Sequence, residues 1–234
     1  MSRKTQKKLR KLLTLVSCAV LLVCVTIGAT VAYLTSTATV TNTFTVGNVA
    51  ITLDEVKVDP NGQAVESAER TSAEQTYHVF PNGTYDKDPT VHVAAGSEEA
   101  FIRMKVTVSD MASLKAAFPA QKYQDFYSGD LFLLEKLVKG WQPETWVSTS
   151  YTESQNASTN KTEGTYEFRY CTTVKGGTTV TDLDPLFTQV NIPETVDNVE
   201  LAMLNNIKII VTAEAIQADG FNGDADAAWA AFAK

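Results

Sequence analysis

Apolar and polar residues alternate along much of the chain after residue 33. The clearest case is 101–108, where Ile102, Met104, Val106 and Val108 are separated by charged or hydroxyl residues. Successive side chains of a β-strand point to opposite faces of its sheet, so this spacing predicts a strand with one buried face.

Other segments show weaker versions of this pattern and are separated by residues that favour turns. Asp59-Pro60-Asn61-Gly62 and Pro81-Asn82-Gly83 are two such turns, and the polar stretch 150–164 predicts a long loop. The further predicted strands are 48–58, 75–80, 90–95, 146–151, 165–174 and 206–217. Many short strands with few helices predict a mostly β protein built as an antiparallel β-sandwich.

Helix signals are confined to two regions. Asp110 is expected to cap a helix that Pro119 ends, and the apolar run within 130–139 stops at Gly140. The Ala-rich C-terminal end holds two aromatic residues three positions apart, Trp229 and Phe232, which can dock on one side of a short helix.

These elements predict one domain over 33–234. Its β-sandwich would carry a helical insertion at about 110–140 and a short C-terminal helix. A sandwich of this size can form a single domain with its own core.

The first 32 residues have the layout of a secretory signal peptide. Six basic residues are followed by an uncharged apolar run that begins at Leu12. Thr30 and Ala32 are small, as signal peptidases require at positions −3 and −1 of a cut before Tyr33. A retained membrane anchor is the alternative, because the run is long enough to span a bilayer. Either way, the positive-inside rule places the rest of the chain outside the cell.

The exported part is strongly acidic. The chain has 20 Lys and Arg against 27 Asp and Glu; without the six basic residues of the signal, 33–234 has 14 against 27, a net charge of −13. Phosphate binding needs a basic surface that releases counterions, so nucleic acid is excluded as a partner. Anionic membrane surfaces would repel this part of the chain as well.

Cys171 is the one thiol that remains after the signal, because Cys18 and Cys24 lie inside it. Without a second thiol, no internal disulfide is expected. No histidine flanks Cys171, so we expect a small buried apolar residue rather than a nucleophile.

The sequence contains no recognisable catalytic or metal-binding motif. His78 and His92 lie in no HExxH helix; they would bind a metal only by meeting a carboxylate across paired strands, and two partly exposed strand histidines are the simpler interpretation. GxSxG and phosphate-loop motifs are absent from the sequence. We therefore expect no catalytic residue, no metal, no cofactor and no enzymatic activity.

Two features leave ligand binding open. Residues 219–226 (DGFNGDAD) are rich in oxygen ligands that would suit calcium, but a turn that caps the terminal helix explains them more simply. Tyr127, Trp141, Trp146 and Tyr151 would suit carbohydrate or protein binding if they were exposed. Packing of the helices against the sandwich is the simpler use of these aromatic side chains.

Three segments resemble the TasA/camelysin group of secreted proteins from Gram-positive bacteria. The first, 28–55, contains Ala32-Tyr33-Leu34 at the expected processing site and the run NTFTVGNV. The second lies within 88–106, and the third, 215–229, matches a closing strand and helix of the group. Residues 109–200 carry little of the pattern.

The resemblance implies a jelly-roll-like sandwich, a signal cut by a SipW-type signal peptidase, and self-assembly into biofilm-matrix fibres, with accessory matrix proteins as further partners. In such proteins the mature N-terminal segment completes the sheet of a neighbouring subunit. The matching segment here is 33–46, with Tyr33, Leu34, Val40, Phe44 and Val46 as candidate contact residues. It is uncharged, free of Gly and Pro, and rich in Thr and Val, which suits addition to a sheet edge. An ordinary first strand in its own sheet is the alternative.

We therefore expect a secreted structural protein that assembles into extracellular or cell-surface fibres. A surface adhesin or ligand-binding module, with 110–164 as its contact face, is a second hypothesis. A camelysin-like metallopeptidase is a third, for which the chain shows no zinc motif.

Overall fold

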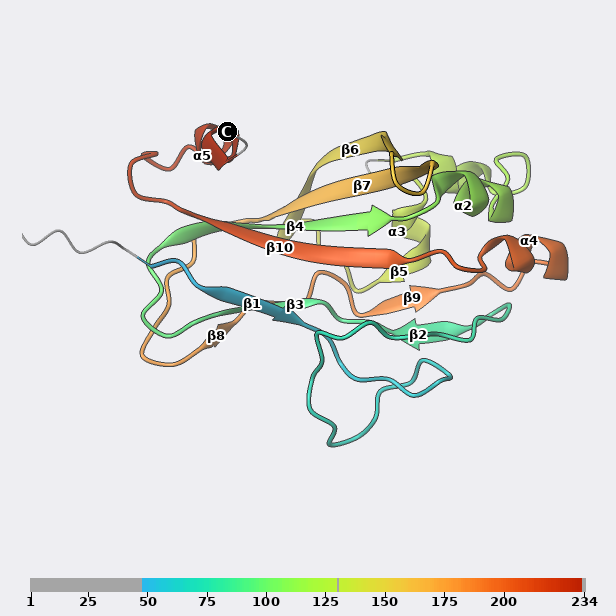
Figure 1. The fold of residues 1–234 in the computed structure, drawn as a ribbon, viewed down its shortest axis with the longest axis horizontal. Helices are drawn as coiled ribbons and strands as arrows, with labels where there is room; N and C mark the ends of the chain where they lie inside the picture. Colours follow the sequence, from blue (N-terminus) through green and yellow to red (C-terminus); the bar gives the residue numbers. More distant parts are fainter. Residues whose placement is uncertain (1–47, 130, 233–234) are drawn as a thin grey trace, which may run out of the picture. The chain divides into compact units, whose positions relative to one another are not determined.

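The computed structural model describes residues 48–129 and 131–232 of the chain (Figure 1). The signal peptide or anchor at 1–32 therefore lies outside the described residues. So do the residues predicted for signal-peptidase recognition and for the polymerisation strand, Thr30, Ala32, Tyr33, Leu34, Val40, Phe44 and Val46.

One layer of the fold is a four-stranded antiparallel sheet. Its strand order is β10-β4-β7-β6, so strands far apart in the sequence are neighbours. The strands are β4 (Ala100–Val108), β6 (Trp146–Asn156), β7 (Lys161–Tyr170) and β10 (Ile209–Gln217).

The facing layer consists of two three-stranded antiparallel sheets, with orders β1-β3-β8 and β2-β9-β5 (Figure 1). The strands are β1 (Ile51–Asp54), β2 (Thr84–Asp86), β3 (Thr90–Val93), β5 (Val138–Lys139), β8 (Thr181–Asp182) and β9 (Gln189–Asn191). The predicted mostly β fold with antiparallel sheets in a sandwich is therefore confirmed.

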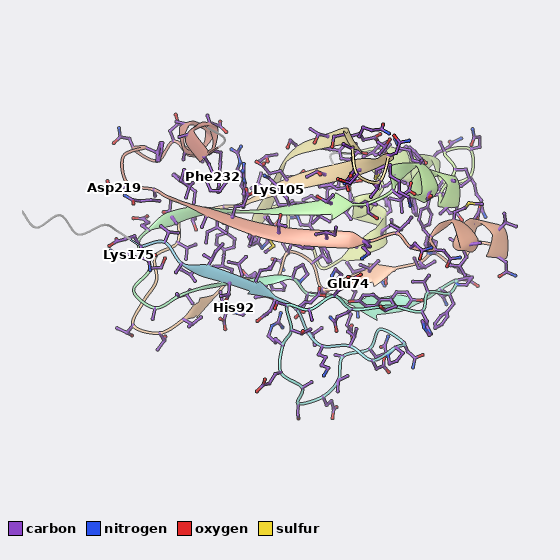
Figure 2. The ribbon with its side chains drawn as sticks, viewed as in Figure 1. Glu74, His92, Lys105, Lys175, Asp219 and Phe232 are labelled. Atoms are coloured by element: carbon purple, nitrogen blue, oxygen red, sulfur yellow. The ribbon has the colours of Figure 1, made fainter. Side chains whose placement is uncertain are left out.

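The strongest sequence pattern supplies the centre of the core. Ile102, Met104, Val106 and Val108 of β4 are at most 2% exposed, whereas Lys105 lies on the outer face of the sheet (Figure 2). Burial of this alternating apolar face stabilises the contact between the two layers.

The first helix of the insertion forms where the sequence places its cap. Helix α2 (Met111–Ala117) begins after Asp110, whose Oδ1 accepts a hydrogen bond of 3.0 Å from the backbone N–H of Ser113. The insertion continues with the 3₁₀ turn η1 (Gln124–Tyr127) and the short helix α3 (Leu134–Leu137). Helices α4 (Asn198–Met203) and α5 (Ala225–Phe232) follow later in the chain.

The predicted loop 150–164 is wrong, because most of it forms the β6–β7 hairpin. The hairpin turns at 157–160, where Asn156 Oδ1 accepts the backbone N–H of Ser158 at 2.9 Å. Strand β6 is an edge strand, and its residues 152–155 are exposed. A strand that is polar on both faces shows no alternation, so its sequence reads as a loop.

The predicted strand 75–80 has no regular partner strand among the described residues. Its odd-numbered residues are half-buried and its even-numbered ones exposed, as in a strand. However, the Gln75 side chain makes the hydrogen bonds to the chain beyond β1, accepting from Val58 N–H at 2.7 Å and donating to Val56 O at 2.8 Å. Side-chain pairing here takes the place of a backbone ladder.

The prediction that Cys171 is buried is also wrong, since its side chain is exposed. The residue lies just after the end of β7, where the inward-facing pattern of that strand no longer applies.

The four aromatic residues considered for binding pack in or against the core, as the simpler interpretation expected. Trp146 is fully buried, and its backbone oxygen accepts a hydrogen bond of 2.8 Å from Nε1 of Trp141. Tyr127 and Tyr151 each pack on Phe132, with ring centroids 5.1 and 5.3 Å apart. Within the described residues, no helix is both long and apolar enough to cross a membrane.

We predict that Met104→Ala lowers the free energy of unfolding by about 2–5 kcal/mol, because it leaves a cavity at the centre of the core. Lys105→Ala, on the opposite face of the same strand, should change it by no more than about 1 kcal/mol. Urea unfolding of the two variants measures both values. Equal losses would contradict the assignment of the two faces.

Candidate functional site: an apolar groove beside strand β10

Strand β10 lies at an edge of the four-stranded sheet. It pairs with β4 along all nine residues, from Ile209 opposite Val108 to Gln217 opposite Ala100. In the described part of the chain, no strand pairs with its other edge. One row of backbone N–H and C=O groups therefore lacks a strand partner, which makes this edge a template for a further strand.

An open groove of about 660 Å³ lies beside this edge. Ile209 and Val211 of β10 form one wall, and the segment 71–79 together with Leu53 of β1 forms the other. The floor reaches the core and consists of apolar and aromatic side chains: Val108, Leu114, Phe118, Leu134, Leu137 and Tyr166. These floor side chains are at most 6% exposed, so the groove is open to solvent between its walls and not through the core.

A surface ion pair joins the two walls at the mouth of the groove. Lys208 Nζ lies 2.7 Å from Glu74 Oε1, and both side chains are more than half exposed. Figure 2 shows Glu74 close to the end of β10 at which that strand begins. An exposed pair of this kind contributes at most about 1 kcal/mol, so it closes the mouth only weakly.

The polar end of the groove holds a charge that is already paired. Lys87 is 8% exposed, and its ammonium group forms an ion pair with Glu55. Burial, with the nearby carboxylates of Glu55, Asp88 and Asp86, raises the pKa of Tyr77 well above its usual range. Because the ammonium group of Lys87 is already paired with Glu55, it is not available to bind an anion in the groove.

The wall segment is anchored by a charged network on the outer face of the β1-β3-β8 sheet. His92 of β3 is bound at both ring nitrogens: Nδ1 lies 2.7 Å from Asp182 of β8, and Nε2 lies 2.9 Å from Asp54 of β1. Arg70, directly before the wall segment, binds Asp54 and, at 2.8 Å, Asp88. The network joins three strands to the start of the wall.

Electrostatics favour the charged form of His92. Burial by itself lowers the pKa of the imidazole, but the hydrogen bonds to Asp182 and Asp54 outweigh it, so the pKa is raised above 6.5. Burial likewise acts to raise the pKa of Asp54, yet the contacts with His92 and Arg70 hold it below its usual value.

The predicted candidates for metal binding are placed in other roles. His92 joins two carboxylates, and His78 lies on the exposed side of the 75–80 segment. Asp224 caps α5 by accepting the backbone N–H of Ala227 at 2.9 Å, which confirms the turn-and-cap interpretation of 219–226. Within residues 48–129 and 131–232, no group of three or more His, Cys, Asp or Glu side chains is placed to hold a metal ion.

No protein-family model, no curated protein and no solved structure matches this chain. We therefore infer the function from the edge strand, the groove and the sequence of the N-terminal segment.

Sequence reasoning missed the groove because its walls are at least 130 residues apart in the chain. The segment 206–217 was expected to form a strand, but its place at a sheet edge was not predicted. The alternation of Ile209, Val211, Ala213 and Ala215 was the available signal. It shows a buried face and says nothing about which edge is paired.

We predict that the stability contributed by the His92 network is fully present below about pH 6.5 and is lost as the pH rises through the raised pKa of His92. The folded state binds the His92 proton more tightly than the unfolded state, so the free energy of unfolding falls with pH in this window. His92→Gln should remove this slope, whereas the exposed control His78→Gln should keep it. Urea unfolding between pH 6 and pH 9 measures it; an unchanged slope in His92→Gln would contradict the assignment.

Proposed function

We propose that this protein is a secreted, non-enzymatic structural protein that assembles into extracellular fibres. The N-terminal segment 33–46 of one copy adds to the free edge of β10 in another copy. The observation that carries the proposal is the edge of β10, which no other described strand pairs with, beside an open apolar groove.

The segment has the chemistry of an added strand. Its 14 residues contain no charged residue, no Gly and no Pro, and they are rich in Thr and Val. Fully extended, 14 residues span about 45 Å, which exceeds the roughly 30 Å of a nine-residue strand such as β10. Backbone hydrogen bonds to the edge would supply affinity, and side chains in the groove would supply specificity.

Burial in the groove provides the driving force. Moving a Leu, Val or Phe side chain from water into an apolar site contributes about 1.5–3 kcal/mol each. The floor side chains are at most 6% exposed, so an inserted strand would mainly cover half-buried apolar side chains of the walls, such as Tyr77 and Val211.

Export and processing belong to the same proposal. The basic and apolar character of residues 1–32 suits a signal peptide, and the resemblance to the TasA/camelysin group implies a SipW-type signal peptidase that recognises Thr30, Ala32 and Tyr33. Cleavage before Tyr33 would free the segment that we propose to be donated. Accessory matrix proteins would be further partners.

A ligand-binding module is the second candidate, and the groove favours it as well. Its volume of about 660 Å³ lies in the range of sites for small molecules. The aromatic residues first considered for this role do not support it, because Trp146 is buried and Tyr151 packs on Tyr166.

We predict that mature 33–234 forms fibres and that a chain beginning at Gly47 stays monomeric and folded, because it lacks the strand to be donated. Electron microscopy and size-exclusion chromatography at neutral and acid pH measure this. Acid should promote assembly, since protonation of carboxylates reduces repulsion between bodies of net charge −13.

Folded monomers of the longer chain under all these conditions would contradict fibre assembly and favour the ligand-binding module. A truncated chain that fails to fold would contradict donation, because the segment would then be a core strand of its own domain. Far-ultraviolet circular dichroism of both chains distinguishes these two outcomes.

A further inference from the structure

The segment 33–46 alternates strictly between two kinds of residue. Its odd-numbered positions are Tyr33 followed by six threonines, at 35, 37, 39, 41, 43 and 45. Its even-numbered positions are Leu34, Ser36, Ala38, Val40, Asn42, Phe44 and Val46. As a β-strand, this segment would have a threonine face and a mainly apolar face.

Strand β10 has an apolar inner face and an outer face of mixed apolar, hydroxyl and charged residues. Ile209, Val211 and Ala213 pack towards the core. Thr212 is exposed on the outer face. A strand that pairs with β10 continues both faces, because directly opposite residues of paired strands point to the same side.

The outer face of the sheet contains a row of threonines, which Ile210 of β10 separates from this edge. Thr107 of β4 lies between Ile210 of β10 and Thr165 of β7, and Thr165 lies opposite Thr152 of β6. The hydroxyl groups of Thr107 and Thr165 are 3.1 Å apart and form a hydrogen bond. A threonine face on the next strand would lie on the same side of the sheet as this row, beyond Ile210.

We propose that the segment 34–46 of a second copy binds β10 with its even-numbered residues in the groove and its threonines on the outer face. Phe44 and Val40 fill the groove and determine specificity. This inference rests on the proposed function, and it adds the face, the direction and the residues of the interaction.

The direction follows from the antiparallel pairing of the sheets. Every pair of strands in the described residues is antiparallel. A segment antiparallel to β10 has its C-terminal part, with Phe44, beside the beginning of that strand. Ile209 and Val211, which line the groove, lie at this end.

In the antiparallel direction, the chain's own Phe44 cannot reach Val211. Asn48 lies at the other end of β10: its oxygen accepts the N–H of Glu98, and the neighbouring Glu99 oxygen accepts the N–H of Ala218, just after β10 ends. From Val211 to Gln217 the strand spans about 20 Å, whereas the four residues from Phe44 to Asn48 span at most about 14 Å. An antiparallel segment with Phe44 beside Val211 therefore belongs to another copy, and repetition of this contact produces a head-to-tail fibre.

Two pairs of neighbouring substitutions test which face enters the groove. In mature 33–234, Phe44→Glu and Val40→Glu should raise the concentration needed for fibres by on the order of 100-fold or more, because each buries an unpaired carboxylate. Thr43→Glu and Thr39→Glu add the same charge to the outer face. They should change the concentration needed for fibres by about threefold or less. Sedimentation and electron microscopy measure the concentration. All four positions lie outside the described core, and circular dichroism checks that each monomer is folded.

A mixing experiment tests exchange between copies. Val211→Glu should block the groove while its donor segment stays intact, and Phe44→Glu should block the donor while its groove stays intact. Each alone should be monomeric, and an equimolar mixture should form a 1:1 dimer and no fibre, measured by size-exclusion chromatography with light scattering. Thr212→Glu, on the outer face of β10, is the matched control and should still form fibres.

The outcomes separate this inference from the proposed function. If the wild type forms fibres and Glu changes the concentration needed for fibres equally at odd-numbered and even-numbered positions, the assigned face is wrong. The proposal of fibre assembly is then still supported. If the wild type stays monomeric, the proposed function fails with it. If Val211→Glu does not fold, the comparison of Phe44→Glu with Thr43→Glu still decides the face.

Discussion

The fold depends on the two opposite faces of strand β4. Its inner face, with Met104 at the centre, is fully buried against the second layer. Its outer face holds Arg103, which donates from Nε to Glu214 at 2.5 Å and from Nη1 to Glu167 at 3.1 Å. The guanidinium lies 4.2 Å from the ring of Trp229 and thereby docks the C-terminal helix α5 on the sheet. Backbone pairing then fixes β7 and β10 on either side of β4, so one strand positions the core, the outer ion network and the last helix.

Among the described residues, this arrangement leaves β10 paired on one side only. Proteins usually protect such an edge with charge, a covering segment or a short strand, because unpaired backbone groups recruit other chains. Here the wall segment 71–79, anchored through Arg70 and closed at the mouth by Lys208 and Glu74, covers the groove in part. The acidic body adds repulsion between copies. The edge is therefore only partly protected. Such an edge suits the binding of one specific strand better than non-specific aggregation.

Local patterns predicted the elements whose environment is local or one-sided. The inward face of β4, the capping of α2 by Asp110 and the terminal helix with Trp229 all have the predicted form. The β6–β7 hairpin was missed because both faces of β6 are polar around residues 152–155. The exposure of Cys171 was missed because the sequence does not show that β7 ends at Tyr170, one position earlier.

By itself, the sequence determined the mostly β character of this protein, the faces of its main strands and the alternation within 33–46, because these properties depend on neighbours one or two residues away. Only the tertiary structure decided that β10 lies at an edge, that His92 joins two carboxylates and that residues 71–79 form a wall opposite Val211. Strand order and groove walls bring together residues separated by more than a hundred positions. No local periodicity encodes such contacts, since they follow from how the whole chain buries its apolar faces.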